Sequence, residues 1–578
     1  MSQKIWVCDD EPSARYPVWT RGNVGEVFVQ AASPLTWSLL GRYAFEPGWR
    51  EAFYEMGVFA PDDFGPAGQP EVVACFGGYI YINMSVTRVM AVRIPGLTVE
   101  AMDRSFFGDY PGAPPYRPDP RDENAARSAA AATWLQMLFT TDAMPTTDAD
   151  RGRLDALLAR QPQLSILSDI QLLDYFRSLA GEVRLGFKRH VLNTYGANVL
   201  ASVIAQTAAA TGTSELTSQV TAAVGEVDSA DHSLELWRLS RTVRAIPAVS
   251  AAFDAGVDAL VERMHAWHDP SVALFLSQWS RFLQDWGFIG PSVWDFRSPT
   301  YRSDPAIALR MLDRLRTAPD SADPALRTAR LRALRAAAIE RIAACLPSGS
   351  AAQSQFLAAA HQAGNYLAAR ERSKMHCTLI IDHMRDVIRT LGQRLVQRGQ
   401  LRQWDHVLLL NDDELDGFLA DPASHAGLVA ERAAQLADLI SREPPFVFEN
   451  QAPPLSAFVP RKSTAAGRAA SGREQLSGMG VSPGLHTGRA RVIRSLDEES
   501  ELEPGEVIVA PITDSSWGPL FLTAGAVVVE TGATISHAAI VARELGIPAV
   551  VSVLGATQRI AQGATVTVNG HSGVVTIH

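Results

Sequence analysis

Cysteine is scarce in this chain, and its few cysteines are widely separated. The 578 residues include only Cys8, Cys75, Cys345 and Cys377, and no two of them form a Cys-x-x-Cys pair. Disulfide frameworks and clustered metal sites need cysteines in close or paired spacing, so we expect neither. The scarcity fits a reducing compartment, and we predict a cytoplasmic protein.

Long apolar runs and an excess of positive charge are also missing. No stretch approaches the roughly 20 apolar residues of a membrane helix, and the N-terminal residues lack the apolar core of a signal peptide. The formal net charge of −10 argues against binding to nucleic acid or to anionic membranes. No Gly-x-x-x-x-Gly-Lys-Ser/Thr phosphate loop is present either, which excludes the most familiar nucleotide site.

The length of the chain predicts two to four domains, because 578 residues are too many for one hydrophobic core. Residues 1–110 are rich in glycine, proline and aromatics, with short β-like runs at 72–75 and 79–82. Residues 123–440 show helical periodicity. The clearest helices are expected at 325–345 and at 376–398, before Gly399.

The C-terminal part shows a different pattern. Residues 449–474 are small and polar, as flexible linkers are, and beyond them strands and helices alternate. Strands are predicted at 505–510, 526–530 and 549–553, with a helix at 536–545. The predicted fold class is therefore multidomain α+β: a large, mostly helical region with a β-containing N-terminal part, tethered to a C-terminal α/β domain. Two domains are predicted, 1–448 and 475–578, joined by the linker 449–474. The first domain has a second possible boundary near 110–122.

The most informative residue is His537, which lies between a Gly/Thr turn and the predicted Ala-rich helix. A helix N-terminus offers unpaired backbone N–H groups and partial positive charge, both of which suit a phosphoryl group. The small Ala538 and Ala539 are expected to leave the imidazole uncovered. Thr534 and Ser536 are candidates for binding the phosphoryl oxygens, and capping the helix is their alternative role.

The motif around His537 resembles the phosphohistidine swivelling domain of the phosphoenolpyruvate-utilising family. The resemblance rests on Glu530-Thr-Gly-Ala-Thr-Ile-Ser-His537, Gly480-Val-Ser-Pro-Gly484 and Thr513-Asp-Ser-Ser-Trp517, in that family's order along the chain. It implies that His537 is the catalytic nucleophile, which receives a phosphoryl group and passes it on. Arg543, on the same predicted helix, is expected on a solvated face, and a position near the phosphate is the alternative.

Earlier segments resemble the acceptor-binding domain of rifampin-phosphotransferase-like proteins. They are Trp19-Thr-Arg-Gly-Asn23-Val-Gly-Glu26, Ala32-Ser-Pro-Leu-Thr36, Gly77-Gly-Tyr-Ile-Tyr81 and Arg370-Glu-Arg-Ser-Lys374. The resemblance makes eight residues acceptor-site candidates: Trp19, Asn23, Glu26, Thr36, Tyr81, Arg370, Glu371 and Lys374. The alternatives are core packing for the aromatics, a structural ion pair for Glu26, and a solvated helix face for the charged run.

One segment departs from the family pattern. The family often has Gly-His-Arg-Gly followed by a glutamate, whereas this chain has Phe288, Ile289 and Val293 at those positions. Apolar side chains can neither transfer protons nor pair with phosphate. The acceptor is therefore expected to differ from rifampin.

The resemblance also implies a division of labour between two proteins. The chain begins with acceptor-like sequence and has no recognisable ATP-grasp domain, an arrangement similar to phenylphosphate synthase. We expect a separate ATP-grasp partner that binds ATP with Mg²⁺ and charges His537, no cofactor in this chain, and a small hydroxylated organic substrate. The alternatives are a regulatory phosphocarrier or binding protein, and direct charging by phosphoenolpyruvate.

Overall fold

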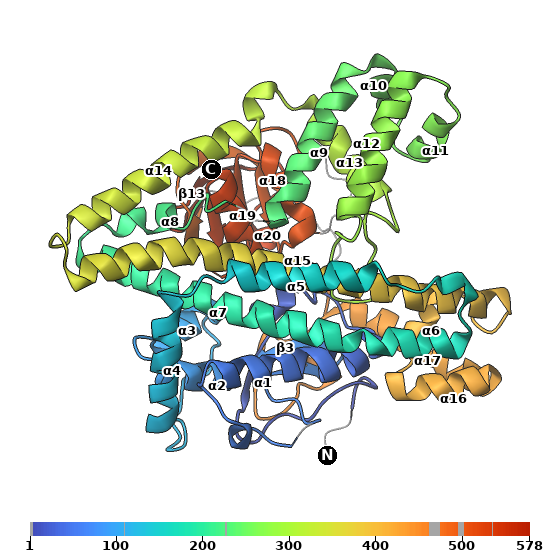
Figure 1. The fold of residues 1–578 in the computed structure, drawn as a ribbon, viewed down its shortest axis with the longest axis horizontal. Coiled ribbons are helices and arrows are strands. Elements are labelled where there is room, and N and C mark those ends of the chain that lie inside the picture. The colour runs from blue at the N-terminus through green and yellow to red at the C-terminus, as the bar shows by residue number, and fades with distance from the viewer. Residues whose placement is uncertain are drawn as a thin grey trace. The chain divides into compact units, whose positions relative to one another are not determined.

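The computed structural model describes residues 4–66, 68–108, 110–225, 228–461, 474–494, 502–533 and 536–578 (Figure 1). The chain forms two compact units, each assembled from separate segments. Unit 1 comprises Met1–Leu200, Trp294–Arg297 and Asn365–Ala465. Unit 2 comprises Ala201–Val293, Ser298–Gly364 and Ala466–His578. The helices 201–293 and 298–364 thus pack with the C-terminal residues, a grouping that differs from the predicted division at 448 and 475.

Unit 1 contains an antiparallel sheet with the strand order β2-β3-β1-β5. Its strands are β1 (Val18–Thr20), β2 (Val73–Phe76), β3 (Tyr79–Asn83) and β5 (Val447–Glu449). Strands β2 and β3 confirm the β-like runs predicted near the N-terminus. Both are buried along their whole length, which explains why their sequences contain no charged residue and show no simple alternation of apolar and polar residues.

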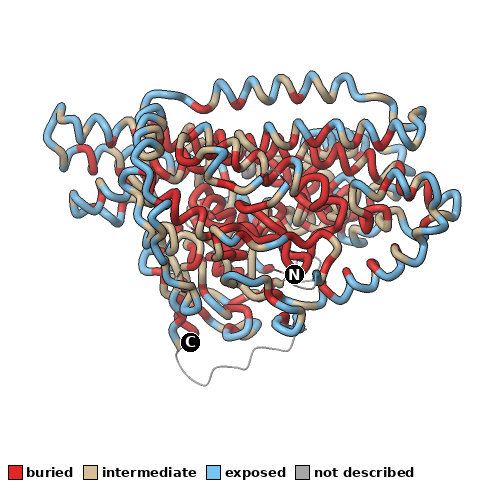
Figure 2. Tube along the Cα trace, turned by 90° about the horizontal axis from the view of Figure 1, so that it is seen from below, coloured by how far each residue is buried: buried red, intermediate tan, exposed pale blue. Residues whose placement is uncertain are grey.

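Helices make up most of the rest of unit 1. They are η1 (Val24–Glu26), η2 (Thr36–Phe45), α1 (Glu46–Glu55), η3 (Pro61–Asp63), α2 (Met84–Arg93), α3 (Val99–Phe107), α4 (Ala125–Leu138), α5 (Met144–Leu158), η4 (Leu164–Ile166), α6 (Asp169–Ser178), η7 (Trp404–Leu409), η8 (Asp412–Glu414), α16 (Leu415–Ala420), η9 (Pro422–His425), α17 (Ala426–Ile440) and η10 (Leu455–Ala457). Figure 2 shows buried and exposed turns alternating along such helices, as expected for amphipathic helices.

Two long helices, α7 (Ala180–Ala210) and α15 (Ala351–Gln397), contribute residues to both units. The helix predicted at 376–398 is the C-terminal half of α15. Its periodic residues Ile380, Met384 and Leu391 are buried, and Gly399 follows the helix with φ 71°. The periodicity marked only this half because the preceding turns are rich in alanine and polar residues, which give no clear apolar stripe.

Unit 2 has a helical part and a sheet. The helical part contains η5 (Ser214–Leu216), α8 (Thr217–Val220), α9 (Asp228–Ala245), α10 (Pro247–Asp254), α11 (Leu260–His265), α12 (Pro270–Trp286), α13 (Ala306–Thr317), η6 (Asp320–Ala322) and α14 (Pro324–Ala344). Helix α14 confirms the helix predicted at 325–345.

The eight-stranded sheet of unit 2 has the order β7-β14-β13-β9-β10-β11-β12-β8. Its strands are β7 (Glu474–Ser477), β8 (Met479–Ser482), β9 (Leu485–Val492), β10 (Val507–Ala510), β11 (Ala526–Val529), β12 (Ala549–Val551), β13 (Thr565–Asn569) and β14 (Val574–Ile577). Strands β9 to β12 are mutually parallel. Short elements η11 (Ser515–Trp517), α18 (Gly518–Thr523), α19 (His537–Leu545) and α20 (Ala556–Arg559) connect them. The predicted combination of a mostly helical region and a strand-and-helix C-terminal region is confirmed.

The turn after β13 begins with Asn569-Gly570, and glycine is needed at position 570 for a steric reason. A Cβ atom added to Gly570 would lie 1.8 Å from the carbonyl oxygen of Ser482, at the end of β8. Any larger residue would therefore force the loop after β13 away from this sheet edge.

The predicted linker is shorter than expected at its start. Residues 447–449 form β5, and the two-stranded pair β4 (Arg442–Glu443) and β6 (Val459–Pro460) extends ordered structure to Pro460. Residues 462–473 lie outside the described residues, so the linker there stays a prediction. Among the described residues, none of the helices combines the length and the apolar character needed to cross a bilayer.

Candidate functional site

Helix α19 begins at His537, as the sequence predicted. Ser536 is its N-cap residue, and the Ser536 hydroxyl accepts a hydrogen bond from the Ala539 N–H at 3.4 Å. Ser536 thus has the capping role, and its contact with a phosphoryl group stays a prediction. Thr534 lies outside the described residues.

The imidazole of His537 has a neighbour that the sequence did not identify. Thr513 Oγ1 lies 3.3 Å from His537 Nδ1, so a hydrogen bond joins the loop after β10 to the start of α19. When Nδ1–H donates to the threonine hydroxyl, the lone pair of the neutral ring is on Nε2. In that tautomer Nε2 is the nucleophilic nitrogen.

The expectation that His537 is uncovered is wrong. Only 6% of the residue is exposed, because α18 packs across α19 and places the Phe521 ring 5.9 Å from the imidazole centroid. A neighbouring helix covers the imidazole, which a local motif cannot reveal.

The segment that departs from the family pattern lies in the same unit as His537. Phe288, Ile289 and Val293 are all buried. In the same segment, the backbone N–H of Ser292 donates to the carboxylate of Asp514 at 2.9 Å, directly beside Thr513. A backbone hydrogen bond therefore connects the apolar segment to the loop whose Thr513 contacts His537.

The other end of α19 is buried as well. Arg543 is only 8% exposed, which corrects the expected solvated face, and its guanidinium donates to the Val481 carbonyl at 3.5 Å. Glu544 accepts a hydrogen bond from the Val224 N–H at 3.2 Å. Burial, the largest cause, raises the pKa of Glu544 to about 7, while the nearby Val224 N–H, Arg543 and Arg335 lower it. Arg335 comes from α14, which packs against α19.

This raised pKa predicts a pH-dependent stability for unit 2. A carboxyl group whose pKa rises on folding favours the folded state below its ordinary pKa, and that contribution is lost as the pH rises toward 7. We expect the free energy of unfolding to fall by roughly 2–3 kcal/mol between about pH 5 and about pH 8. Glu544→Gln should remove this decline, because the glutamine side chain cannot ionise. Its amide oxygen can still accept the hydrogen bond from the Val224 N–H.

Urea denaturation at the two pH values measures the effect. Glu340→Gln is a matched control, because Glu340 is an exposed residue of α14. An equal decline in wild type and in Glu544→Gln would show that Glu544 is not the titrating group.

Unit 1 contains a buried basic cluster on α15. Arg370, Glu371 and Lys374 are 8%, 2% and 7% exposed, so the solvated helix face considered for this charged run is wrong for these three residues. Arg370 and Glu371 form an ion pair. Arg372 follows the expected pattern instead: it is less buried and pairs with the exposed Asp148. Buried cations held on one rigid helix can bind an anionic group.

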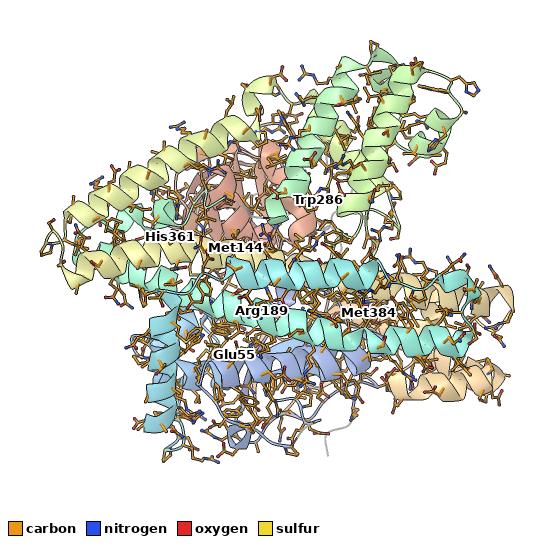
Figure 3. All side chains as sticks on the ribbon, in the orientation of Figure 1. Glu55, Met144, Arg189, Trp286, His361 and Met384 are labelled. Carbon is orange, nitrogen blue, oxygen red and sulfur yellow. The ribbon has the colours of Figure 1, made fainter. Side chains whose placement is uncertain are left out.

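His190 joins this cluster from α7, and sequence reasoning did not single it out. Its Nδ1 lies 3.2 Å from the carbonyl oxygen of Arg370. Asn193, one turn further on, donates to the Ala369 carbonyl at 3.1 Å, which fixes α7 beside this part of α15. In Figure 3 the label of Arg189 marks the preceding position on α7. No motif links residues 190 and 370, because only the pairing of the two helices brings them together.

The N-terminal candidates lie elsewhere in unit 1, mostly in its core. Trp19, Thr36 and Tyr81 are fully buried, and the Tyr81 hydroxyl donates to the Pro445 carbonyl at 2.7 Å. Glu26 is also buried in η1, and Asn23 precedes it with φ 70°. The structure gives the aromatics their alternative role of core packing, and an acceptor contact for any of these residues stays a prediction.

No metal site can be built from the described residues, since nowhere in the described ranges do three or more histidine, cysteine, aspartate or glutamate side chains group as a metal would require.

Two families match this chain. The mobile domain of PEP-utilising enzymes matches residues 502–573, which include His537 and Thr513, and the rifampicin phosphotransferase fourth domain matches residues 190–371. Residues 502–573 are thus similar to the mobile domain of the phosphoenolpyruvate-utilising enzymes, and residues 190–371 are similar to a domain of rifampicin phosphotransferase. The resemblance recognised in the sequence is confirmed.

Similar proteins are found in several bacteria. An uncharacterised protein of Mycobacterium tuberculosis is 40% identical over 192 residues, 33% of this chain and 21% of that protein. The prodigiosin synthesizing transferase PigC of Serratia marcescens is 28% identical over 366 residues, 62% of this chain and 39% of that protein. The rifampicin phosphotransferase of Streptomyces sviceus is 34% identical over 186 residues, 32% of this chain and 20% of that protein. The chain thus spans between 20% and 39% of the length of these relatives.

Proposed function

We propose that this chain is the carrier and acceptor-binding component of a phosphotransferase. His537 receives a phosphoryl group and passes it to a hydroxyl of a small organic molecule. The observation that carries the proposal is the position of His537 at the N-terminus of α19, with Nδ1 beside Thr513, inside the segment that matches the mobile domain. A ring with one nitrogen hydrogen-bonded presents the other to phosphorus, and the helix N-terminus favours the added negative charge.

The acceptor side of the proposal rests on the cluster in unit 1. Arg370 and Lys374 are four residues apart on α15, so they share one face of the helix. Together they can stabilise the transferred phosphoryl group as charge builds on its oxygens. The apolar Phe288, Ile289 and Val293 favour an acceptor other than rifampin.

We further propose that the phosphoryl group comes from a separate ATP-grasp protein, which binds ATP with Mg²⁺. The relatives named phosphotransferases are considerably longer than the matched part, in keeping with a donor function outside these residues. The whole assembly would then consist of a donor protein, this chain and the acceptor molecule.

Intact-mass spectrometry tests the function directly. The chain is incubated with Mg²⁺ and ATP, with and without the ATP-grasp partner, and any modified peptide is sequenced. A gain of one acid-labile phosphoryl group, dependent on the partner and located on His537, supports the proposal. Charging by phosphoenolpyruvate without a partner would favour the second donor considered above.

A regulatory phosphocarrier or binding protein is the second candidate function. The burial of His537 and the apolar replacements at Phe288 and Ile289 favour it, because both reduce contact with a polar acceptor. The two candidates differ in product: a phosphorylated small molecule forms only under the first. Charging of His537 with no transfer to any hydroxylated compound would select the second.

A further inference from the structure

The hydrogen bond of His190 determines which of its ring nitrogens is basic. A backbone carbonyl only accepts hydrogen bonds, so His190 Nδ1 must carry the proton that it shares with Arg370 at 3.2 Å. In the neutral ring the lone pair is therefore on Nε2. The residue keeps some solvent exposure, unlike its neighbours Arg370 and Lys374.

Three charged residues of α15 act on the His190 imidazole, which is also desolvated by burial. Arg370 and Lys374 disfavour a protonated imidazole, whereas Glu371 favours it. Desolvation is the largest cause of the shift, and with the two cations it lowers the pKa of His190 to about 3. The imidazole is thus neutral at physiological pH. It is also a weak base for as long as the two cations carry no anion.

Two aromatic side chains also lie near the His190 ring. Phe187 and Trp294 lie with their ring centroids 6.2 and 6.3 Å from that of His190. Trp294 is 4% exposed, and its indole N–H has no acceptor within the part of the chain that the structure describes. Buried donors are normally satisfied, and one that is not is a common feature of a ligand site. The cluster therefore combines cations, a neutral imidazole and an available indole N–H.

We propose that His190 is the general base of phosphoryl transfer and that the phosphoryl group itself activates it. The inference rests on the proposed function and adds the residue that takes the acceptor's proton. A dianion held by Arg370 and Lys374 offsets their charge at the imidazole. His190 becomes more basic only when the phosphoryl group is in place.

His190 Nε2 takes the proton of the acceptor hydroxyl while that oxygen forms a bond to phosphorus. The phosphorus–nitrogen bond to His537 breaks, and its electron pair returns to the imidazole of His537. The phosphorylated product then leaves. The charges of Arg370 and Lys374 again disfavour the imidazolium of His190, so its proton passes to water. Neither an oxidant nor a further reactant is needed.

Two carboxylates compete with His190 for this role. Glu371 is ion-paired with Arg370, so its carboxylate is already engaged by one of the two cations. Glu26 lies buried in η1, on another element. His190 is the group next to both cations that is neutral before the transfer begins.

Sulfate is a suitable probe because its charge does not change across the relevant pH range. Nuclear magnetic resonance follows the His190 ring protons of the full chain during a pH titration, with and without sulfate. We expect sulfate to raise the titration midpoint by at least about one pH unit, equivalent to roughly ten-fold tighter sulfate binding to the protonated form. Calorimetry should then show sulfate binding that strengthens as the pH falls.

Three variants identify the residue that causes the pH dependence of sulfate binding. His190→Gln keeps a donor for the Arg370 carbonyl and should bind sulfate with no such pH dependence. Lys374→Met should weaken sulfate binding and raise the midpoint of His190 even without sulfate. Glu371→Gln serves as the comparison. An unmoved His190 midpoint with sulfate bound, or a pH dependence lost in Glu371→Gln and kept in His190→Gln, would overturn the proposal.

Transfer kinetics separate this inference from the proposed function. His190→Gln should slow transfer from phosphorylated His537 by about 100-fold or more and leave the charging of His537 unchanged. The sulfate titration needs no phosphorylation, so it should give the same result in His537→Asn. A wild-type chain that no donor charges, but whose His190 still responds to sulfate, would disprove the phosphotransferase and retain the anion-linked histidine. Normal transfer in His190→Gln would disprove the role as base.

Discussion

Replacing His537 with asparagine is expected to abolish phosphorylation of the chain. Asparagine has no nucleophilic nitrogen, so both charging and onward transfer should fall by more than about 1,000-fold. Asparagine is tolerated at the first turn of a helix, and Ser536 remains to cap α19. Intact mass after incubation with Mg²⁺, ATP and the partner protein measures the loss.

Thr513→Val is the matched control for this prediction. It removes the hydroxyl 3.3 Å from His537 Nδ1 and keeps the shape of the side chain. Loss of one neutral hydrogen bond should slow charging by roughly five-fold, because the nucleophile remains. Full phosphorylation of His537→Asn would place the carrier group on another residue, and an equal loss in both variants would make the hydroxyl as essential as the imidazole.

Sequence reasoning predicted the carrier domain well because its signals are local. The apolar runs that became β10 and β11 are continuous, as buried parallel strands require, and α19 follows a turn with its N-cap residue next to His537. Helix boundaries agreed within one or two residues for α14 and α19. In each case a few consecutive residues determine the element.

The remainder depends on contacts between distant segments, which local patterns do not encode. Phe521 covers His537 from a separate helix, and Ser292 reaches Asp514 across more than 200 residues of chain. The charged run on α15 is a clear case: its i, i+4 spacing is equally compatible with a solvated face and with a buried site. The packing of α7 against α15 determines that Arg370 and Lys374 are buried rather than solvated.

Lys374→Met is expected to damage transfer and spare charging. The buried ammonium group of Lys374 is one of two cations proposed to hold the phosphoryl group, and methionine keeps the length of the side chain. Removing one preorganised charged donor from a water-poor site costs about 100- to 1,000-fold in the rate of the step that uses it. Rapid-quench measurement of phosphohistidine decay in the presence of acceptor isolates that step.

Arg372→Met provides the matched control, because Arg372 belongs to the same charged run but pairs with the exposed Asp148. Exposed ion pairs contribute little, so this variant should charge and transfer within about two-fold of wild type. The contrast between two cations only two residues apart distinguishes a phosphoryl site from a general effect of positive charge on α15. Equal losses in both variants would assign the effect to the overall charge of the helix, and the acceptor cluster would then have to be sought on another surface of unit 1.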